Sequence, residues 1–316
     1  MSKQFDLIYD LIDQAAMIYY DNLKVDYLEA LLLVNKGLNY DEFDSRLTDE
    51  AIIKLEEIYH IFSLESFYNE EVRLALELLI IKAFKHINFP LNIMTPDFIN
   101  YLLVIIVNSL FKNEDITILD TALGTANMLQ AISNNYVNHA KIIGIENNEM
   151  LTKIASASAD LQNNELIIYF QDALNTVLDV VDLVVGDLDA YDVEENKLSK
   201  NHLYQQGVRY FPYLMITERL NNLRPGGYFI YLIENDFFQK ENNDLFKQYL
   251  EKEASLLGLI ILPKEIFLDG YLGKSILIGK KEVLHSYELM ILDIPNLSED
   301  SIKRSVNKLK ALIEKI

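Results

Sequence analysis

The sequence of 316 residues predicts an α/β protein in which a mostly parallel sheet, with helices on both faces, follows a helical N-terminal domain. Two observations predict this fold. Apolar residues recur at spacings of three and four up to about residue 90, which is typical of amphipathic helices. From residue 116 onward, short apolar runs alternate with segments long enough for a helix, which is typical of a parallel sheet. We therefore expect two domains, residues 1–90 and residues 91–316.

The N-terminal domain shows four helical patterns. In the first of them, Leu7, Leu11 and Ile18 fall on one helix face. Pro90 and Pro96 interrupt the helical texture, which indicates a domain boundary near residue 90. The helices are predicted at residues 5–20, 26–39, 49–62 and 69–87.

Seven apolar runs in the second domain predict a seven-stranded sheet. The strands are predicted at residues 116–120, 141–146, 166–170, 181–185, 228–233, 256–262 and 274–280. Residues 287–294 are predicted as an additional strand, and residues 298–316 as a closing helix capped by Ser298.

The chain is strongly acidic, with 48 Asp and Glu residues against 28 Lys and Arg residues and a net charge of −20. Proteins that bind nucleic acid usually neutralise phosphates with Lys and Arg. This chain has no cluster of basic residues, so we expect most of its surface to repel a duplex. The acidity also has a simpler interpretation, which is solubility.

Several kinds of chemistry are excluded by composition. The absence of cysteine excludes disulfides and thiolate metal sites, and the five histidines have no metal-ligand spacing, so no metal site is predicted. The apolar run at residues 98–111 suits a buried helix better than a membrane span. We expect a soluble, cytoplasmic protein with no membrane partner.

A candidate ligand site begins with the stretch "ITILDTALGTANML", residues 116–129. Ligands of open parallel sheets bind beyond the carboxyl ends of the strands, where Asp120 ends the first strand. Gly124 allows a tight turn, and the helix predicted from about Thr125 directs amide N–H groups at an anion. The site therefore offers an acceptor for an ammonium beside donors for a carboxylate. The alternative is an ordinary turn with a capping aspartate.

The next two strands end in acids as well. Glu146 can accept both hydroxyls of a ribose, and Asp172 can accept from an adenine amino group while Ala173 donates its backbone N–H. Taken singly, Glu146 could be a loop residue and Asp172 a helix N-cap. Together with Asp120, these residues predict a ligand that has an ammonium, a ribose and an adenine, which describes S-adenosylmethionine.

The chain resembles the class I S-adenosylmethionine-dependent methyltransferases. Among them it is similar to the adenine-N6 DNA methyltransferases, and most to small relatives of the type I restriction–modification modification subunit. The resemblance covers roughly residues 90–282 and includes a helix–Pro-Gly-Gly–strand unit and a closing strand pair. The segment "LDTALGTAN" resembles the family loop Asp-Pro-x-x-Gly-Thr-Gly-Asn, with Thr121 in place of the proline and Ala126 in place of the second glycine.

This resemblance implies a Rossmann-like methyltransferase sheet and a set of cofactor contacts. Thr95 and Pro96 match the family's Thr-Pro segment at the methionine end of the cofactor. The cofactor-binding residues that it implies are Thr95, Pro96, Asp120, Ala122, Gly124, Thr125, Asn127, Glu146, Asn147, Asp172 and Ala173.

The resemblance also locates the catalytic loop after the fourth strand. There the family reads Asn/Asp-Pro-Pro-Tyr/Phe and this chain reads "GDLDAYDVEE". Asp187 would accept protons of the acceptor's amino group, and Tyr191 would stack on a flipped-out base. Both prolines are absent, and further acids follow Asp187, which opposes a phosphodiester.

Two functions stay open. The first is a methyltransferase of the adenine-N6 type with an uncertain acceptor, either nucleic acid or another molecule. The second is an inactive methyltransferase fold that acts as a binding or scaffold module for a protein partner. A nucleotide-dependent oxidoreductase is disfavoured because the G-x-G-x-x-G fingerprint is absent.

Overall fold

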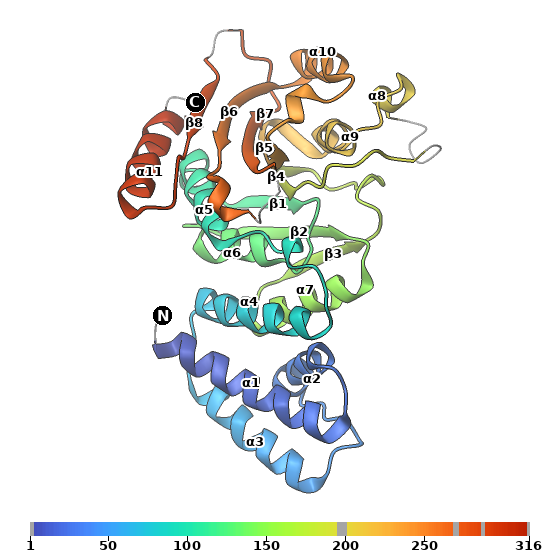
Figure 1. Ribbon diagram of the computed structural model, residues 1–316, viewed down its shortest axis with the longest axis vertical. Helices are drawn as coiled ribbons and strands as arrows, with labels where there is room; N and C mark the ends of the chain where they lie inside the picture. Colours follow the sequence, from blue (N-terminus) through green and yellow to red (C-terminus); the bar gives the residue numbers. More distant parts are fainter. Residues whose placement is uncertain (1–2, 195–200, 268–271, 286–287, 315–316) are drawn as a thin grey trace. The chain divides into compact units, whose positions relative to one another are not determined.

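The computed structural model describes residues 3–194, 201–267, 272–285 and 288–314 of the chain (Figure 1). The chain separates into two compact units, each built from several segments. The first unit consists of Met1–Asp97, Leu123–Asn135 and Asn148–Ile168, and the second of Phe98–Ala122, Tyr136–Asn147 and Tyr169–Ile316.

The first unit is helical. Asp26 and Thr48 begin two of its helices, because their side chains accept hydrogen bonds from the backbone N–H groups of Glu29 and Ala51. The four helices predicted before residue 90 are confirmed. The elements are α1 Lys3–Leu23, α2 Tyr27–Tyr40, α3 Asp49–Leu64, α4 Asn69–His86, the 3₁₀ turn η1 Leu91–Ile93, α6 Asn127–Asn135 and α7 Glu149–Leu161.

Helices from later in the chain complete the core of this unit. Leu151 and Ile154 of α7 are buried in the same apolar cluster as the faces of α1 to α4. An amphipathic helix needs such a partner, because its apolar stripe must leave water. The two compact units therefore do not divide the chain at one position, and the boundary near residue 90 stays a prediction about sequence domains.

Except for residues 166–168, which belong to the first unit, the sheet lies in the second unit. Its strands are β1 Ile116–Asp120, β2 Ala140–Glu146, β3 Leu166–Phe170, β4 Val181–Asp187, β5 Leu223–Glu234, β6 Ser255–Ile261, β7 Lys274–Lys280 and β8 Met290–Asp293. Its helices are α5 Asp97–Leu110, α8 His202–Gln205, α9 Phe211–Arg219, α10 Asn243–Glu253 and α11 Glu299–Ile313, with the 3₁₀ turns η2 Leu220–Asn222, η3 Phe237–Gln239 and η4 Lys264–Ile266.

The described strands form one sheet of eight, in the order β3-β2-β1-β4-β5-β7-β6-β8. β1 runs parallel to β2 and β4, and β4 runs parallel to β5. β7 runs antiparallel to β5 and β6, and β8 pairs with β6 in parallel. The seven predicted strands and the additional one are confirmed. β5 is longer than predicted, since it begins at Leu223 and includes the Pro-Gly-Gly turn, where Gly226 has φ +78°.

Two helix starts differ from the predictions. α6 begins at Asn127, two residues later than expected from Thr125. α11 begins after Ser298, as predicted, but the Ser298 side chain makes no cap hydrogen bond. Its hydroxyl donates instead to Asn296 Oδ1 at 2.6 Å, so the predicted side-chain cap is wrong.

The segment Leu91–Leu110 is long and apolar enough to cross a membrane by length and composition, with a mean hydropathy of 1.5. Core helices of soluble proteins pass the same test. Half of the apolar window is buried inside the structure, and in α5 the buried residues include Leu102 and Ile106. The burial agrees with the predicted core helix at residues 98–111.

Candidate active site

The parallel strands β1, β2 and β4 end on the same side of the sheet, and three of the predicted acids lie there. This side, formed by the carboxyl ends of the strands, is called the edge of the sheet below. Asp120 pairs in register with Gly144 of β2 on one side and with Val185 of β4 on the other. Glu146 and Asp187 each lie two residues further along those strands, so they flank Asp120 and project beyond it. These three acids therefore lie on neighbouring strands at this end of the second unit.

Asp120 is the buried member of the row, with an exposed fraction of 0%. Its Oδ1 accepts from the backbone N–H of Ala122 at 2.9 Å, while its Oδ2 is buried without a hydrogen-bond partner. Burial, together with the negative charges of Asp187 and Glu146, raises the pKa of Asp120 to about 7, although the hydrogen bond from Ala122 lowers it. A carboxylate in this setting gains most from a cation, because a buried charge without a partner is costly.

Glu146 and Asp172 follow at neighbouring positions of the same edge. The backbone N–H of Gln171 donates to the carbonyl of Glu146 at 3.0 Å, which joins the ends of β2 and β3. Glu146 Oε1 accepts from the N–H of Asn147, and Asp172 Oδ1 accepts from the N–H of Leu174, both at 2.9 Å. Asp172 therefore closes a turn that contains the half-buried Ala173, and no helix begins there, so the alternative interpretation of Asp172 as a helix N-cap is wrong.

The loop after β4 is tied to the segment before α9. The N–H of Phe211 donates to the carbonyl of Tyr191, and the N–H of Val193 donates to the carbonyl of Arg209, both at 2.8 Å. The rings of Tyr191 and Phe211 stack with centroids 4.5 Å apart at 17°. Half of the Tyr191 side chain is exposed, so Phe211 backs one side of a ring that reaches the surface.

A lysine that the sequence did not indicate lies at the end of β4. Lys274 begins β7, and its ammonium forms an ion pair with Asp187 Oδ1. The same ammonium donates to the carbonyl of Leu188 at 3.4 Å. β7 runs antiparallel to β5, so Lys274 at its start pairs with Glu234 at the end of β5. A residue at the start of a strand therefore reaches the carboxyl ends of the parallel strands, and no local sequence signal indicates this.

A buried arginine is a second residue that the sequence did not indicate. Arg219 at the end of α9 is 1% exposed and donates from Nη2 to the carbonyl of Asn175 at 2.7 Å. Burial lowers its pKa, against the effect of the neighbouring Tyr231. The Tyr231 hydroxyl is itself buried without a hydrogen-bond partner, and burial raises its pKa. This cation lies inside the second unit and not at its surface.

Gly186 leaves room for the residue that replaces the family's proline. A Cβ at Gly186 would clash with Thr121 Oγ1 and would lie 3.3 Å from the Tyr231 ring. Thr121 Oγ1 uses this room to donate to the carbonyl of Val185 at 3.1 Å. Glycine next to Asp187 is therefore required by the threonine that follows Asp120.

We expect Gly186→Ala to lower the free energy of unfolding by about 1–3 kcal/mol, because overpacking a buried site forces its neighbours to shift. Adding Thr121→Ala should recover much of that loss, since the clashing hydroxyl is then gone. Urea unfolding of the two single variants and the double variant tests this coupling. Strictly additive losses would contradict it.

The other predicted cofactor residues belong to the first unit. Gly124 has φ +56° and Ala126 has φ +63°, and Thr125 between them is buried. Ala126 therefore holds a left-handed conformation that a Cβ disfavours by about 1–2 kcal/mol, as expected where the family has glycine. The carbonyl of Ala126 accepts from the N–H of Gln130 at 2.9 Å, so the turn leads directly into α6.

Arg73 of α4 ties two of the predicted cofactor segments together. Its guanidinium, in a side chain that is 2% exposed, donates from Nη1 to Asn127 Oδ1 and from Nη2 to Asp97 Oδ1, both at 2.7 Å. Asp97 follows directly after Thr95 and Pro96 in the chain, and Thr95 is buried.

Two further acids complete the surroundings of this guanidinium. Glu70 accepts two hydrogen bonds from Arg73, at 2.7 and 2.9 Å, and Glu77 accepts one at 3.0 Å. Burial raises the pKa of Glu77, and the positive charge of Arg73 opposes that rise. The N-terminal helices therefore hold both the Thr-Pro segment and the start of α6 through one side chain.

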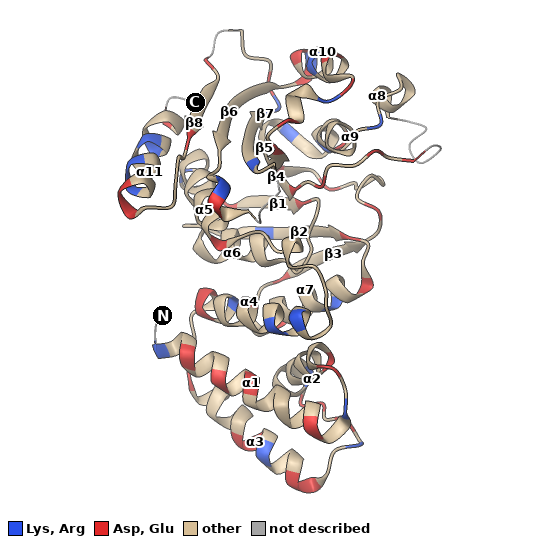
Figure 2. Cartoon of the chain, in the orientation of Figure 1, with Lys and Arg blue, Asp and Glu red and all other residues tan. Residues whose placement is uncertain are grey.

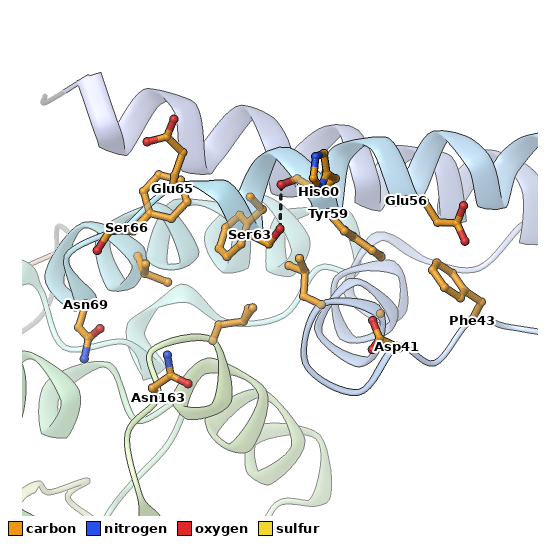
Figure 3. A pocket seen from close by; sticks show the side chains of 16 residues that line it. Asp41, Phe43, Glu56, Tyr59, His60, Ser63, Glu65, Ser66, Asn69 and Asn163 are labelled. Carbon is orange, nitrogen blue, oxygen red and sulfur yellow. Dashed lines mark hydrogen bonds between the residues drawn. The ribbon is translucent and has the colours of Figure 1, made fainter.

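A separate hollow of about 680 Å³ lies in the first unit (Figure 3). α3 contributes Glu56 and Ser63, whose hydroxyl donates to the carbonyl of His60 at 2.8 Å, and Asn163 follows the end of α7. None of the residues predicted to bind the cofactor or to act in catalysis lines this hollow.

A parallel sheet extended by an antiparallel β7, with acids at the ends of successive strands, defines a class I S-adenosylmethionine-dependent methyltransferase fold. Solved structures agree. A Listeria monocytogenes protein assigned to that class matches with a TM-score of 0.84 and 28% identity, over 99% of each chain. The type I restriction–modification methyltransferase subunit of Streptococcus thermophilus matches in fold, with a TM-score of 0.66 and 13% identity, over 96% of this chain and 74% of that one.

Sequence comparison gives the family. Residues 92–316 match the N-6 DNA methylase family, and residues 6–84 match the YtxK N-terminal helical domain. The chain belongs to the N-6 DNA methylase family. It is 30% identical over 266 residues to the uncharacterized protein YtxK of Bacillus subtilis (strain 168), covering 82% of this chain and 81% of that protein.

Proposed function

We propose that this chain binds S-adenosylmethionine and transfers its methyl group to a nitrogen atom of an acceptor. The observation that carries the proposal is Asp120, a fully buried carboxylate with one partnerless oxygen at the end of β1. The ammonium of the cofactor would supply the missing partner. The family and the fold support the same cofactor.

The methionine end of the cofactor is assigned to residues of three segments. In this proposal Thr95 and Pro96 contact the methionine end, and the turn from Gly124 through Thr125 to Asn127 binds the carboxylate through backbone N–H groups. Ala122 orients Asp120 through their 2.9 Å hydrogen bond.

The nucleoside end of the cofactor has its own partners in the proposal. Glu146 accepts from the ribose hydroxyls, with Asn147 beside it. Asp172 accepts from the adenine amino group, and Ala173 donates its N–H to the ring. Both acids already hold a backbone N–H with one oxygen, which limits their rotation.

Catalysis is assigned to the loop after β4. When bound, the cofactor supplies a methyl group on a sulfonium. Asp187 and the carbonyl of Leu188 accept hydrogen bonds from the acceptor NH₂ group and so direct its lone pair. Tyr191, braced by Phe211, stacks on the acceptor. Lys274 holds the Asp187 carboxylate in place through its ion pair.

Calorimetry with S-adenosylmethionine and S-adenosylhomocysteine tests cofactor binding. We expect heat with both, none with NAD⁺, and an affinity lower by about 10- to 100-fold in Glu146→Gln, which loses a charge-assisted hydrogen bond to the ribose. No heat at millimolar cofactor would end the proposal. Binding without any methyl transfer in a labelled-cofactor assay would favour the binding or scaffold function.

The proposal also covers the cellular location, the domains and the partners of the protein. We infer a cytoplasmic enzyme with two sequence domains, residues 1–90 and 91–316, and a protein or nucleic-acid partner. The match with modification subunits of restriction–modification systems supports a nucleic-acid acceptor, whereas the net charge of −20 opposes one. Co-sedimentation of the purified chain with duplex DNA at low salt tests that alternative.

A further inference from the structure

Carboxylates dominate the edge of the sheet at which the acceptor would bind. Asp120, Glu146 and Asp187 lie at the ends of β1, β2 and β4, and the charges of the last two act on the first. Asp172 and Asp189 act on the hydroxyl of Tyr191, and burial and both charges raise the Tyr191 pKa to about 12. Further acids of the second unit follow on the loop after β4 and at the end of β5, namely Asp192, Glu194, Glu234 and Asp236 (Figure 2).

Four of the cations described near this edge are engaged or buried, and a fifth, Lys264 after β6, is exposed. Lys274 pairs with Asp187, and Lys240 pairs with Asp236 at 2.8 Å and Glu234 at 3.4 Å. The Arg209 guanidinium lies 4.0 Å from the centre of the Tyr204 ring and donates to the carbonyls of Tyr204 and Val208. Arg219 is buried. The edge is therefore strongly negative even after its ion pairs are counted.

This charge selects among acceptors. S-adenosylmethionine carries one net positive charge, which neutralises only part of the edge. A phosphate backbone that approached Tyr191 would meet the exposed acids Asp189, Asp192 and Glu194 with no phosphate-binding Lys or Arg among the described residues of that loop. A basic polypeptide would instead be attracted, and its association would be steered by the same charges.

The geometry of the catalytic loop specifies the reacting group. Asp187 Oδ1 and the Leu188 carbonyl are close enough to share the ammonium of Lys274, so they form a pair of neighbouring acceptors. Two acceptors beside an exposed aromatic face suit a planar NH₂ group. On a polypeptide, such groups are the guanidinium of arginine and the carboxamide of glutamine or asparagine.

We propose that the methyl acceptor is a planar NH₂ group in a basic segment of a polypeptide, and not a nucleic-acid base. The proposal rests on the methyl-transfer function above and adds the substrate class. In the transfer, a nitrogen–carbon bond forms as the carbon–sulfur bond breaks, and the electron pair of that bond stays on sulfur. The proton released by the acceptor nitrogen passes to the Asp187 carboxylate and then to solvent.

The test uses the full chain and cofactor labelled on its methyl group. The acceptor probes are three separate fractions, namely total protein, total RNA and genomic DNA, prepared from source cells in which the gene for this chain has been deleted. We expect label in the protein fraction alone. Acid hydrolysis then distinguishes the two sources of the NH₂ group, because arginine yields a labelled methylarginine and a carboxamide releases labelled methylamine.

A charge variant and a catalytic variant serve as controls. Neutralising the loop with Asp189→Asn, Asp192→Asn and Glu194→Gln together should lower protein labelling at least tenfold at low salt, with cofactor binding unchanged in calorimetry. Asp187→Ala should abolish labelling. Label in DNA or RNA, or no label in protein from a preparation that binds the cofactor, overturns the proposal. A preparation that does not bind the cofactor instead refutes the methyl-transfer function.

Discussion

Asp120→Asn is expected to abolish cofactor binding and at the same time to stabilise the free protein at pH 8 by about 2–4 kcal/mol. The ionised carboxylate is buried with one oxygen lacking a partner, and its pKa is raised to about 7. Raising a carboxyl pKa from 3.8 to about 7 corresponds to roughly 4 kcal/mol of cost to the ionised folded state. Asparagine keeps the shape and the acceptor for Ala122 without the charge.

The pH dependence gives the sign of this effect. Below pH 3.8, the carboxyl is protonated in both the folded and the unfolded chain, so it costs nothing. As pH rises, the unfolded chain ionises first, and the folded state loses stability until the pH passes about 7. Cofactor affinity should depend on pH in the opposite sense to stability. Because the ammonium prefers the ionised carboxylate, the affinity should fall as pH drops below about 7.

Urea unfolding at pH 5 and pH 8, together with calorimetry at both values, measures these two effects. The variant should lose the part of the pH dependence that Asp120 causes. Asp192→Asn is the matched control, since Asp192 is an exposed acid on the loop after β4, and the stability of that variant should change by less than about 0.5 kcal/mol. An Asp120→Asn protein that is less stable than wild type at pH 8, or that still binds the cofactor, would contradict the interpretation.

Arg73→Met is expected to lower the free energy of unfolding by about 3–5 kcal/mol, because removing one partner of a buried ion pair leaves uncompensated charge. Arg73 is 2% exposed and binds Glu70, Glu77, Asp97 and Asn127. Arg73→Lys should recover only part of the loss, since an ammonium cannot reproduce the fork of donors that the guanidinium offers.

The control for this prediction is Arg46→Met. Arg46 pairs with Asp44 at 2.7 Å, but its side chain is 57% exposed, and surface pairs contribute about 0–1 kcal/mol. Cofactor affinity is a second readout, and it distinguishes a role of Arg73 in positioning the cofactor segments from its effect on stability. Under conditions where Arg73→Lys is fully folded, its cofactor affinity should fall by at least tenfold, because Asn127 and the Thr-Pro segment lose their common anchor. An unchanged cofactor affinity of Arg73→Lys would show that Arg73 has a structural role only.

Much of the fold was accessible from sequence because its signals are local. The periodicity of residues 1–90 and the apolar runs from Ile116 onward reflect burial of one helix face or of a whole strand. The acids at strand ends could be located for the same reason, since the ends of parallel strands share an edge. The start of α6 was missed by two residues because Ala126 adopts a left-handed turn that glycine normally signals.

The parts that could not be predicted depend on contacts between distant segments. Lys274 lies 87 residues after Asp187 in the chain, and Arg73 lies 54 residues before Asn127. Neither residue carries a pattern that separates it from an ordinary surface cation. The packing of α7 with the N-terminal helices is hidden for the same reason, because an amphipathic stripe shows that a helix needs a partner but does not show which one.

The late position of β7 in the chain has a consequence during synthesis. A ribosome that adds about 5–20 residues per second needs on the order of ten seconds to extend the chain from Asp187 to Lys274, since 87 positions separate them. Throughout that interval the nascent chain lacks both the ammonium for Asp187 and the strand that covers the outer side of β5. The unfinished polypeptide thus carries an open strand edge that invites pairing with other chains, and its acidic character helps to keep such intermediates apart in the cell.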